Sequence, residues 1–156
     1  MKTDEQLFKE IVRRQRDLIW RVCSSYRLSA AWTTEDAFHE VLCNLWRGLG
    51  SFDGRSSERT WVFRVATNTM ISLARKSSNQ PTAPAPEGHD PGFRDDDYRD
   101  MVALIEATPE PDRTIIKAHT QGFGYKDIAN ITGLTVAAVS MRLTRALRKL
   151  RKQYNR

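Results

Sequence analysis

The sequence has few of the residues that metal, redox and disulfide sites require. Its 156 residues include two cysteines, Cys23 and Cys43, and three histidines, His39, His89 and His119, in separate parts of the chain. They do not have the spacing of a zinc site, and two cysteines within helical patterns do not make a disulfide framework. We therefore expect two buried free thiols, no metal site and no cofactor.

Long apolar segments and catalytic motifs are also missing. No run approaches the roughly 18 apolar residues of a membrane span, and the charged start MKTDEQLFKEIVRRQ is unlike a signal peptide. The chain contains no Gly-rich phosphate loop and no nucleophile motif. The sequence therefore predicts a cytoplasmic protein that is not inserted in a membrane and is not an enzyme.

What the sequence does contain is helical periodicity, and no alternating strand pattern accompanies it. A first helix is predicted from the apolar residues between Leu7 and Tyr26. A second is expected to begin at an N-cap Thr34 and to end near Gly48, and a third to run from about residue 58 to residue 76. The predicted fold class is all-α.

A change of composition at residues 77–97 divides the chain. This segment holds four of the six prolines, several acidic residues and no helical stripe, so it is predicted to be a flexible linker. Two small helical domains, residues 1–76 and 98–156, are expected on either side of it. In the second domain, Pro109 and Pro111 suit a helix entry.

The charge is concentrated at the C-terminal end. The whole chain carries a net charge of +6 with a pI near 9.6, whereas residues 113–156 hold ten basic residues and one acidic residue. A segment this basic favours contact with a polyanion such as the phosphate backbone of DNA.

The same segment contains the spacing of a helix-turn-helix, in YKDIANITGLTVAAVSMRLTRALRKLRK. The small Ala129 lets two helices approach closely, and Gly133 supplies the left-handed backbone of the turn. Thr135 is expected to cap the second helix, whose Val139 and Leu143 point inward.

The outer face of that second helix has a small, uncharged start followed by basic residues, which suits the major groove of DNA. A basic helix packed on a bundle and simply solvated is the alternative. The residues predicted to contact DNA are Thr135, Ser140, Met141, Arg142, Thr144, Arg145 and Arg148.

A second candidate site lies in the N-terminal domain. An amide, an aromatic ring and basic side chains are what a pocket for an unstacked base requires, and several such residues lie in one loop and on one face of the third helix. They are Phe52, Arg55, Arg59, Val65, Asn68 and Ser72. Alternatively, Phe52 and Trp61 close a small core and Asn68 is an ordinary surface residue.

Two long segments resemble a known family. TTEDAFHEVLCNLWRGLGSFDGRSSERTWVFRVATNTMISLARK resembles region 2 of the extracytoplasmic-function (group IV) sigma factors of bacterial RNA polymerase, within the sigma-70 family. PEPDRTIIKAHTQGFGYKDIANITGLTVAAVSMRLTRALRKLRK is similar to region 4 of the same family. The two segments occur in the family's order.

The resemblance implies a sigma factor with a region 2 helical bundle in residues 1–76 and a region 4 helix-turn-helix in residues 98–156. Its partners would be core RNA polymerase, promoter DNA and an anti-sigma factor. The first candidate site would contact the −35 element and the second would capture a flipped base of the −10 element. The helix bearing Glu35, Asp36, Glu40 and Asn44 would dock on the clamp helices of the polymerase largest subunit. A self-standing helix-turn-helix regulator is the alternative.

Overall fold

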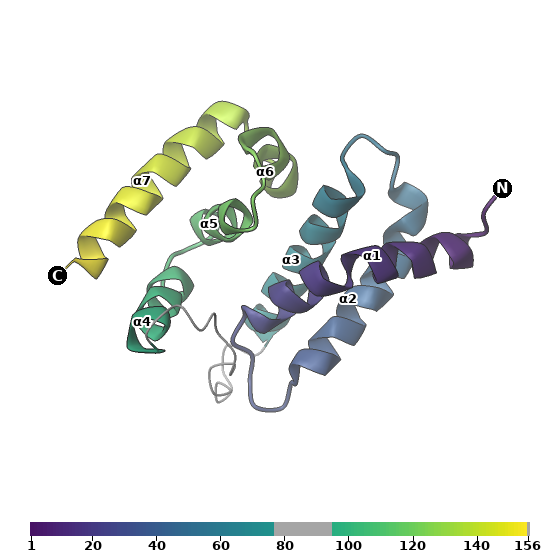
Figure 1. The fold of residues 1–156 in the computed structure, drawn as a ribbon, viewed down its shortest axis with the longest axis horizontal. Helices are drawn as coiled ribbons and strands as arrows, with labels where there is room; N and C mark the ends of the chain where they lie inside the picture. The colour runs from purple at the N-terminus through teal and green to yellow at the C-terminus, as the bar shows by residue number, and fades with distance from the viewer. Residues whose placement is uncertain (77–94, 156) are drawn as a thin grey trace. The chain divides into compact units, whose positions relative to one another are not determined.

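The structure is a computed structural model that describes residues 1–76 and 95–155. These residues form seven α-helices and one short 3₁₀ helix, and they contain no β-strand (Figure 1). The predicted all-α fold is therefore confirmed. The chain divides into two compact units, one within residues 1–86 and one within residues 87–156.

The first unit is a three-helix bundle in which every helix packs against the other two (Figure 1). Its helices are α1 (Asp4–Ser24), α2 (Thr34–Gly48) and α3 (Glu58–Lys76), with a 3₁₀ turn at Leu49–Ser51 after α2. The apolar stripes of the three helices meet in one core because helical spacing places them on a single face of each helix. The side chains buried in this core include Ile11, Ile19, Ala37, Val41, Leu45, Val62, Phe63, Ala66 and Met70.

The start of α2 corrects the predicted N-cap by one residue. The cap is Thr33, whose hydroxyl accepts the backbone N–H of Asp36 at 3.0 Å while the Asp36 carboxylate accepts the backbone N–H of Thr33 at 3.0 Å. This reciprocal arrangement needs an acceptor side chain three residues after the cap. Thr34, the predicted cap, has Ala37 at that position, so it cannot form the same pair.

The two cysteines differ, which corrects the prediction that both are buried. Cys23 is buried in the bundle, whereas Cys43 is exposed on α2. Val41 and Leu45, two residues to either side of Cys43, face the core. Two residues correspond to about 200° of rotation around a helix, so Cys43 faces away from the core.

The second unit contains α4 (Asp95–Glu106), α5 (Asp112–Thr120), α6 (Tyr125–Thr132) and α7 (Val136–Tyr154) (Figure 1). Helix α7 packs against each of the other three. Helix α4 begins at Asp95, so residues 95–97, which were predicted to belong to the linker, are helical. The rest of the predicted linker, residues 77–94, lies outside the described residues. The buried apolar side chains are Ile115, Ile116, Ala118, Phe123, Ile128, Ile131, Val139, Leu143, Ala146 and Leu150.

A cluster of ion pairs joins α4 to α5. Lys117 Nζ lies 2.8 Å from Glu106 Oε1, and Arg113 Nη1 lies 3.7 Å from Glu106 Oε2. Arg113 Nε also donates to Glu110 Oε1 at 2.8 Å. The side chains of Lys117 and Glu106 are only 12% and 17% exposed. Burial is the main cause that lowers the pKa of Lys117 below its ordinary value, and the charge of Glu106 partly opposes that shift.

Candidate nucleic-acid interface

The turn between α6 and α7 has the geometry expected for a helix-turn-helix. Gly133 ends α6 with φ +79°, in the left-handed region, and its N–H donates to the Ala129 carbonyl at 2.9 Å. The Thr135 hydroxyl accepts the Ala138 N–H at 3.1 Å and so caps α7. Val139 and Leu143 of α7 are buried, as is Ile128 of α6. These contacts fix the angle at which α7 leaves the turn.

The N-terminal half of α7 presents small and apolar groups to solvent. Met141 is 54% exposed and Val136 is 47% exposed. Thr144 is exposed, and its hydroxyl donates to the Ser140 carbonyl at 2.9 Å, which leaves the oxygen free to accept a hydrogen bond. Ser140 itself is half-buried. Exposed methyl groups are suited to contact with the thymine methyl in the major groove.

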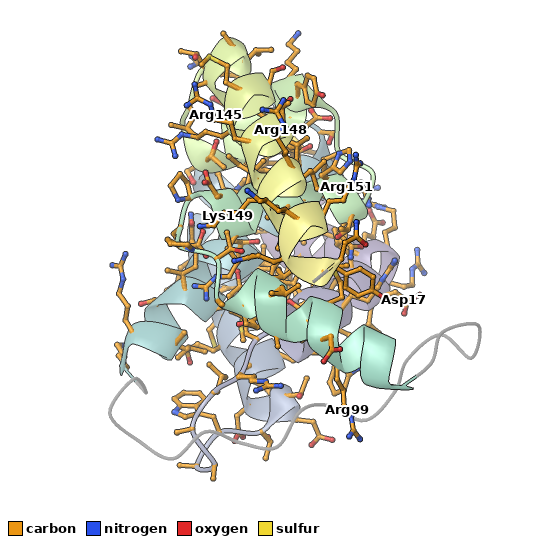
Figure 2. All side chains as sticks on the ribbon, turned by 90° about the vertical axis from the view of Figure 1, so that its left-hand side faces the viewer. Asp17, Arg99, Arg145, Arg148, Lys149 and Arg151 are labelled. Atoms are coloured by element: carbon orange, nitrogen blue, oxygen red, sulfur yellow. The ribbon has the colours of Figure 1, made fainter. Side chains whose placement is uncertain are left out.

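Basic side chains continue from this surface to the end of the helix. Figure 2 shows Arg145, Arg148, Lys149 and Arg151 along α7, and all four are exposed. Guanidinium groups at such positions can bind base edges or phosphates. The described part of α7 carries no acidic residue, so no carboxylate on the same helix competes with DNA for these cations.

Arg142 differs from its basic neighbours. Its Nη1 donates to Asp112 Oδ1 at 3.1 Å, and Asp112 is the first residue of α5. The two side chains remain 45% and 32% exposed, so the pair is weak in energy but defines a direction for the guanidinium. Sequence reasoning placed Arg142 on the DNA face and did not anticipate Asp112, because the two residues are 30 positions apart.

In the first unit, the loop before α3 is anchored by an aromatic stack. The rings of Phe52 and Trp61 have centroids 4.8 Å apart and an interplanar angle of 30°. Trp61 is 3% exposed, whereas Phe52 is half-buried. Phe52 therefore covers the core at the start of α3 and keeps part of its ring accessible. Arg55, further along the loop, is exposed and pairs with Asp53 at 3.1 Å.

One face of helix α3 extends from that stack as a stripe that becomes polar toward its C-terminal end. Trp61, Val65, Asn68 and Ser72 are spaced four, three and four residues apart, so they lie along one face. Burial decreases along the face: Trp61 is buried, Val65 is half-buried, and Asn68 and Ser72 are exposed. The stripe thus begins under Phe52 and opens to solvent at the Asn68 amide. Arg59, also predicted for this site, is half-buried near the start of α3.

The four residues predicted to dock on polymerase do not form one uniform surface. Glu35 and Asp36 are exposed at the start of α2, and Glu40 is half-buried one turn later. Hydrogen bonding from the Thr33 backbone holds the pKa of Asp36 below its ordinary value, so this carboxylate is charged and also caps the helix. Asn44 is half-buried, and its amide donates to Thr69 Oγ1 of α3 at 2.9 Å.

Glu58 joins the start of α3 to α1, a contact that sequence reasoning missed. At the first position of α3 it accepts two hydrogen bonds from Arg14 of α1, at 3.1 and 2.6 Å, and one from Gln15 at 2.7 Å. The bond from Arg14 is the main cause that lowers the pKa of Glu58. An acidic residue in a first helical turn was visible in the sequence, but its partner on α1 was not.

Among the residues that the structure describes, no group of three or more His, Cys, Asp or Glu side chains is placed to hold a metal ion. None of the described helices is both long and apolar enough to span a bilayer.

Comparison with known proteins assigns both units. The family model Sigma-70 region 2 matches residues 11–80, and the model Sigma-70, region 4 matches residues 98–150. The sigma factor SigM of Mycobacterium tuberculosis is 24% identical over 153 residues, which cover 94% of this chain and 76% of SigM. The sigma-E factor of Escherichia coli K12 is 27% identical over 164 residues, covering 93% and 85%. The chain belongs to the extracytoplasmic-function sigma factors.

Solved structures show the same fold. CnrH in complex with the cytosolic domain of CnrY has a TM-score of 0.69 and covers 97% of this sigma factor and 89% of CnrH. The sigma factor RpoE of Bartonella quintana, in complex with the anti-sigma factor NepR, has a TM-score of 0.75 and covers 93% and 94%. Each is 22% identical to this chain, so the likeness concerns the fold alone.

Proposed function

We propose that this sigma factor directs RNA polymerase to promoters by three contacts, which lie on α2, α3 and α7. The observation that carries the proposal is that one chain contains region 2 followed by region 4, each with an exposed polar surface on a well-packed helical unit. Residues 1–76 would form the first functional domain and residues 98–156 the second. The chain would have no catalytic activity of its own.

The surface on α7 would read the −35 element as duplex DNA. Met141, Thr144 and Arg145 are exposed on the first half of the helix, where a recognition helix enters the major groove. Arg145 can bind a guanine in bidentate fashion, and a methyl group can contact thymine. Arg148 and the lysines and arginines after it would bind phosphates, which gives affinity without sequence preference.

The stripe on α3 would act on the melted −10 element. Unstacking a base costs a few kcal/mol, so a pocket that binds only the flipped base lowers the cost of opening the duplex. The accessible part of the Phe52 ring offers a stacking surface, and the Asn68 amide can pair with a base edge. Arg55, Arg59, Val65 and Ser72 would complete the walls of this pocket.

Helix α2 would dock on core polymerase through the exposed carboxylates of Glu35 and Asp36 and the half-buried carboxylate of Glu40. Once polymerase holds both units, their two weak contacts with one promoter gain from a high effective concentration. We place this activity in the cytoplasm, where polymerase and promoter DNA meet. An anti-sigma factor is the partner expected for the inactive state, since the RpoE relative is solved with the anti-sigma factor NepR.

The experiment is transcription in vitro with purified core polymerase and a randomised promoter library, with and without this protein. Transcripts that depend on the protein and share two upstream motifs at a fixed spacing would support the proposal. Tight binding of duplex DNA by the protein alone, with no transcripts, would overturn it in favour of a self-standing regulator.

Variants test the pocket within the same assay. Asn68→Ala is expected to slow promoter opening while polymerase affinity stays unchanged, because the exposed amide acts on the melted strand. Asn155→Ala, an exposed asparagine beyond α7, is the matched control and should behave as the wild type. An equal loss of polymerase affinity and of opening in Asn68→Ala would contradict the role given to the α3 stripe.

A further inference from the structure

A line of hydrogen bonds crosses from α2 to α3 in the first unit. Arg47 Nη1 donates to Asn44 Oδ1 at 3.2 Å, and Asn44 Nδ2 donates to Thr69 Oγ1 at 2.9 Å. The Thr69 hydroxyl then donates to the backbone carbonyl of Val65 at 2.8 Å. We call Arg47, Asn44, Thr69 and the Val65 carbonyl the α2–α3 relay.

The donors in the relay all point the same way. The Thr69 hydroxyl has a single proton, and that proton is given to the Val65 carbonyl, so its oxygen is left to accept from Asn44. Arg47 can only donate, so it requires the oxygen of the Asn44 amide. Both neighbours therefore assign the same orientation to the amide. Aligned hydrogen bonds of this kind polarise one another.

The relay is protected from water where it crosses between the helices. Thr69 is 4% exposed and Asn44 is half-buried. A buried hydroxyl that loses its donor keeps an unsatisfied oxygen, so this contact costs more to break than an exposed one. The Asn44 amide is thus already used within the protein. This separates Asn44 from Glu35 and Asp36, which are exposed on the same helix.

The relay ends within the surface that would read the −10 element. Val65 and Asn68 lie on the α3 stripe that begins at Trp61, and Thr69 directly follows Asn68. A shift of Thr69 relative to α2 would therefore move the Asn68 amide as well. At the other end, Asn44 is one turn after Glu40, on the helix that would dock on polymerase.

We infer that Asn44 is a positioning residue that couples the docking helix α2 to the base-reading stripe of α3, in place of the direct polymerase contact expected from the sequence. The inference rests on the proposed function and deepens it. The hydrogen bond from Asn44 to Thr69 would keep Asn68 in position on α3 while α2 is bound to polymerase.

The test compares Asn44→Ala with Thr69→Val and with Thr69→Ser, on a promoter selected from the library. Thr69→Val removes the acceptor and keeps the shape of the side chain, whereas Thr69→Ser keeps the hydroxyl. Glu40→Ala serves as the example of a lost docking residue. Polymerase affinity is measured by fluorescence anisotropy, opening by 2-aminopurine in the −10 element at saturating sigma factor, and folding by thermal denaturation.

We expect Asn44→Ala and Thr69→Val each to slow opening roughly fivefold, the factor for one hydrogen bond, with unchanged polymerase affinity. The double variant should be no slower than either single variant, because both remove the same bond. Thr69→Ser should open the promoter as the wild type does, because it keeps the hydroxyl that accepts from Asn44. This result is expected whether or not Asn44→Ala lowers stability. Glu40→Ala should instead weaken polymerase binding and open normally at saturation.

Opposite results would distinguish failure of the coupling through Asn44 from failure of the proposed function. If Asn44→Ala weakens polymerase binding and opens normally at saturation, like Glu40→Ala, the inference is wrong and the proposed function stands. Multiplied effects in the double variant, or failure of Thr69→Ser to open the promoter, would also overturn the inference. If the wild-type protein supports no opening with core polymerase, the proposed function fails and the inference fails with it.

Discussion

Replacing Glu106 by glutamine should destabilise the second unit and leave the first unit unchanged. Glutamine keeps the size of the side chain but removes the charge that lies 2.8 Å from Lys117 Nζ. Removing one partner of a fully buried ion pair costs about 3–5 kcal/mol. Because Lys117 and Glu106 are 12% and 17% exposed and Glu110 remains nearby, we expect a smaller loss of about 2 kcal/mol.

The loss should depend on pH through Lys117. Burial lowers its folded-state pKa below the ordinary value of 10.5, so the unfolded chain binds more protons in the window between the two values. The free energy of unfolding therefore rises with pH across that window, and the penalty for burying the ammonium is complete below it. Glu106→Gln lowers the folded-state pKa further. The difference in stability between variant and wild type should therefore shrink between neutral pH and pH about 10.

The two units can be followed separately in urea. All four tryptophans, residues 20, 32, 46 and 61, lie in the first unit, so their fluorescence reports only on that unit, whereas far-UV circular dichroism reports on both. With an m-value of about 1 kcal/mol per molar urea for so small a unit, a loss of 2 kcal/mol lowers the midpoint by roughly 2 M.

The control is Glu5→Gln, which breaks the exposed pair with Lys9, where both side chains are 71% exposed, and should change neither signal. An unchanged circular dichroism midpoint in Glu106→Gln, or a deficit that stays constant up to pH 10, would refute the reasoning.

Three further predictions concern the turn, the thiols and promoter preference. Gly133→Ala should destabilise the second unit by about 1 kcal/mol, since φ is +79° there; Gly50→Ala, with open space around it and no left-handed backbone, should not destabilise the first unit, to which it belongs, and losses of equal size in urea would contradict this. Cys43 should react quickly with Ellman's reagent, whereas Cys23 should react only on unfolding, because burial raises its pKa to about 12; two fast equivalents would be inconsistent with this structure. Arg145→Ala should reduce discrimination at one −35 base pair by about 1–3 kcal/mol, and an unchanged preference in the library would mean that Arg145 contacts phosphate only.

Features fixed by a few neighbouring residues were predictable from the sequence. The helix expected from about residue 58 to residue 76 is α3, Glu58–Lys76. Gly133 ends α6 in the left-handed region and Thr135 caps α7, because each depends on residues within one turn. The error at the start of α2 was also local, since only Thr33 has an acceptor three residues later.

Contacts between distant helices could not be predicted in the same way. Periodicity showed that Cys43 and Asn44 belong to an amphipathic helix, but not that one is exposed and the other bonded to Thr69. The partners of Arg142 and Glu58 likewise come from other helices, 30 and 44 residues away. The contacts with polymerase and promoter stay predictions, because half of the atoms in each contact belong to the polymerase or to the DNA.

On α7, the residues that hold the fold and the residues that would read DNA are different. Val139, Leu143, Ala146 and Leu150 form the buried stripe, whereas Met141, Thr144 and Arg145 are exposed. Exposed substitutions away from caps and ion pairs usually change stability by less than about 0.5 kcal/mol. Promoter preference can therefore diverge in evolution without a compensating change in the core. A family built on this helix can acquire new regulons by substitutions on one face while the opposite face keeps the domain folded.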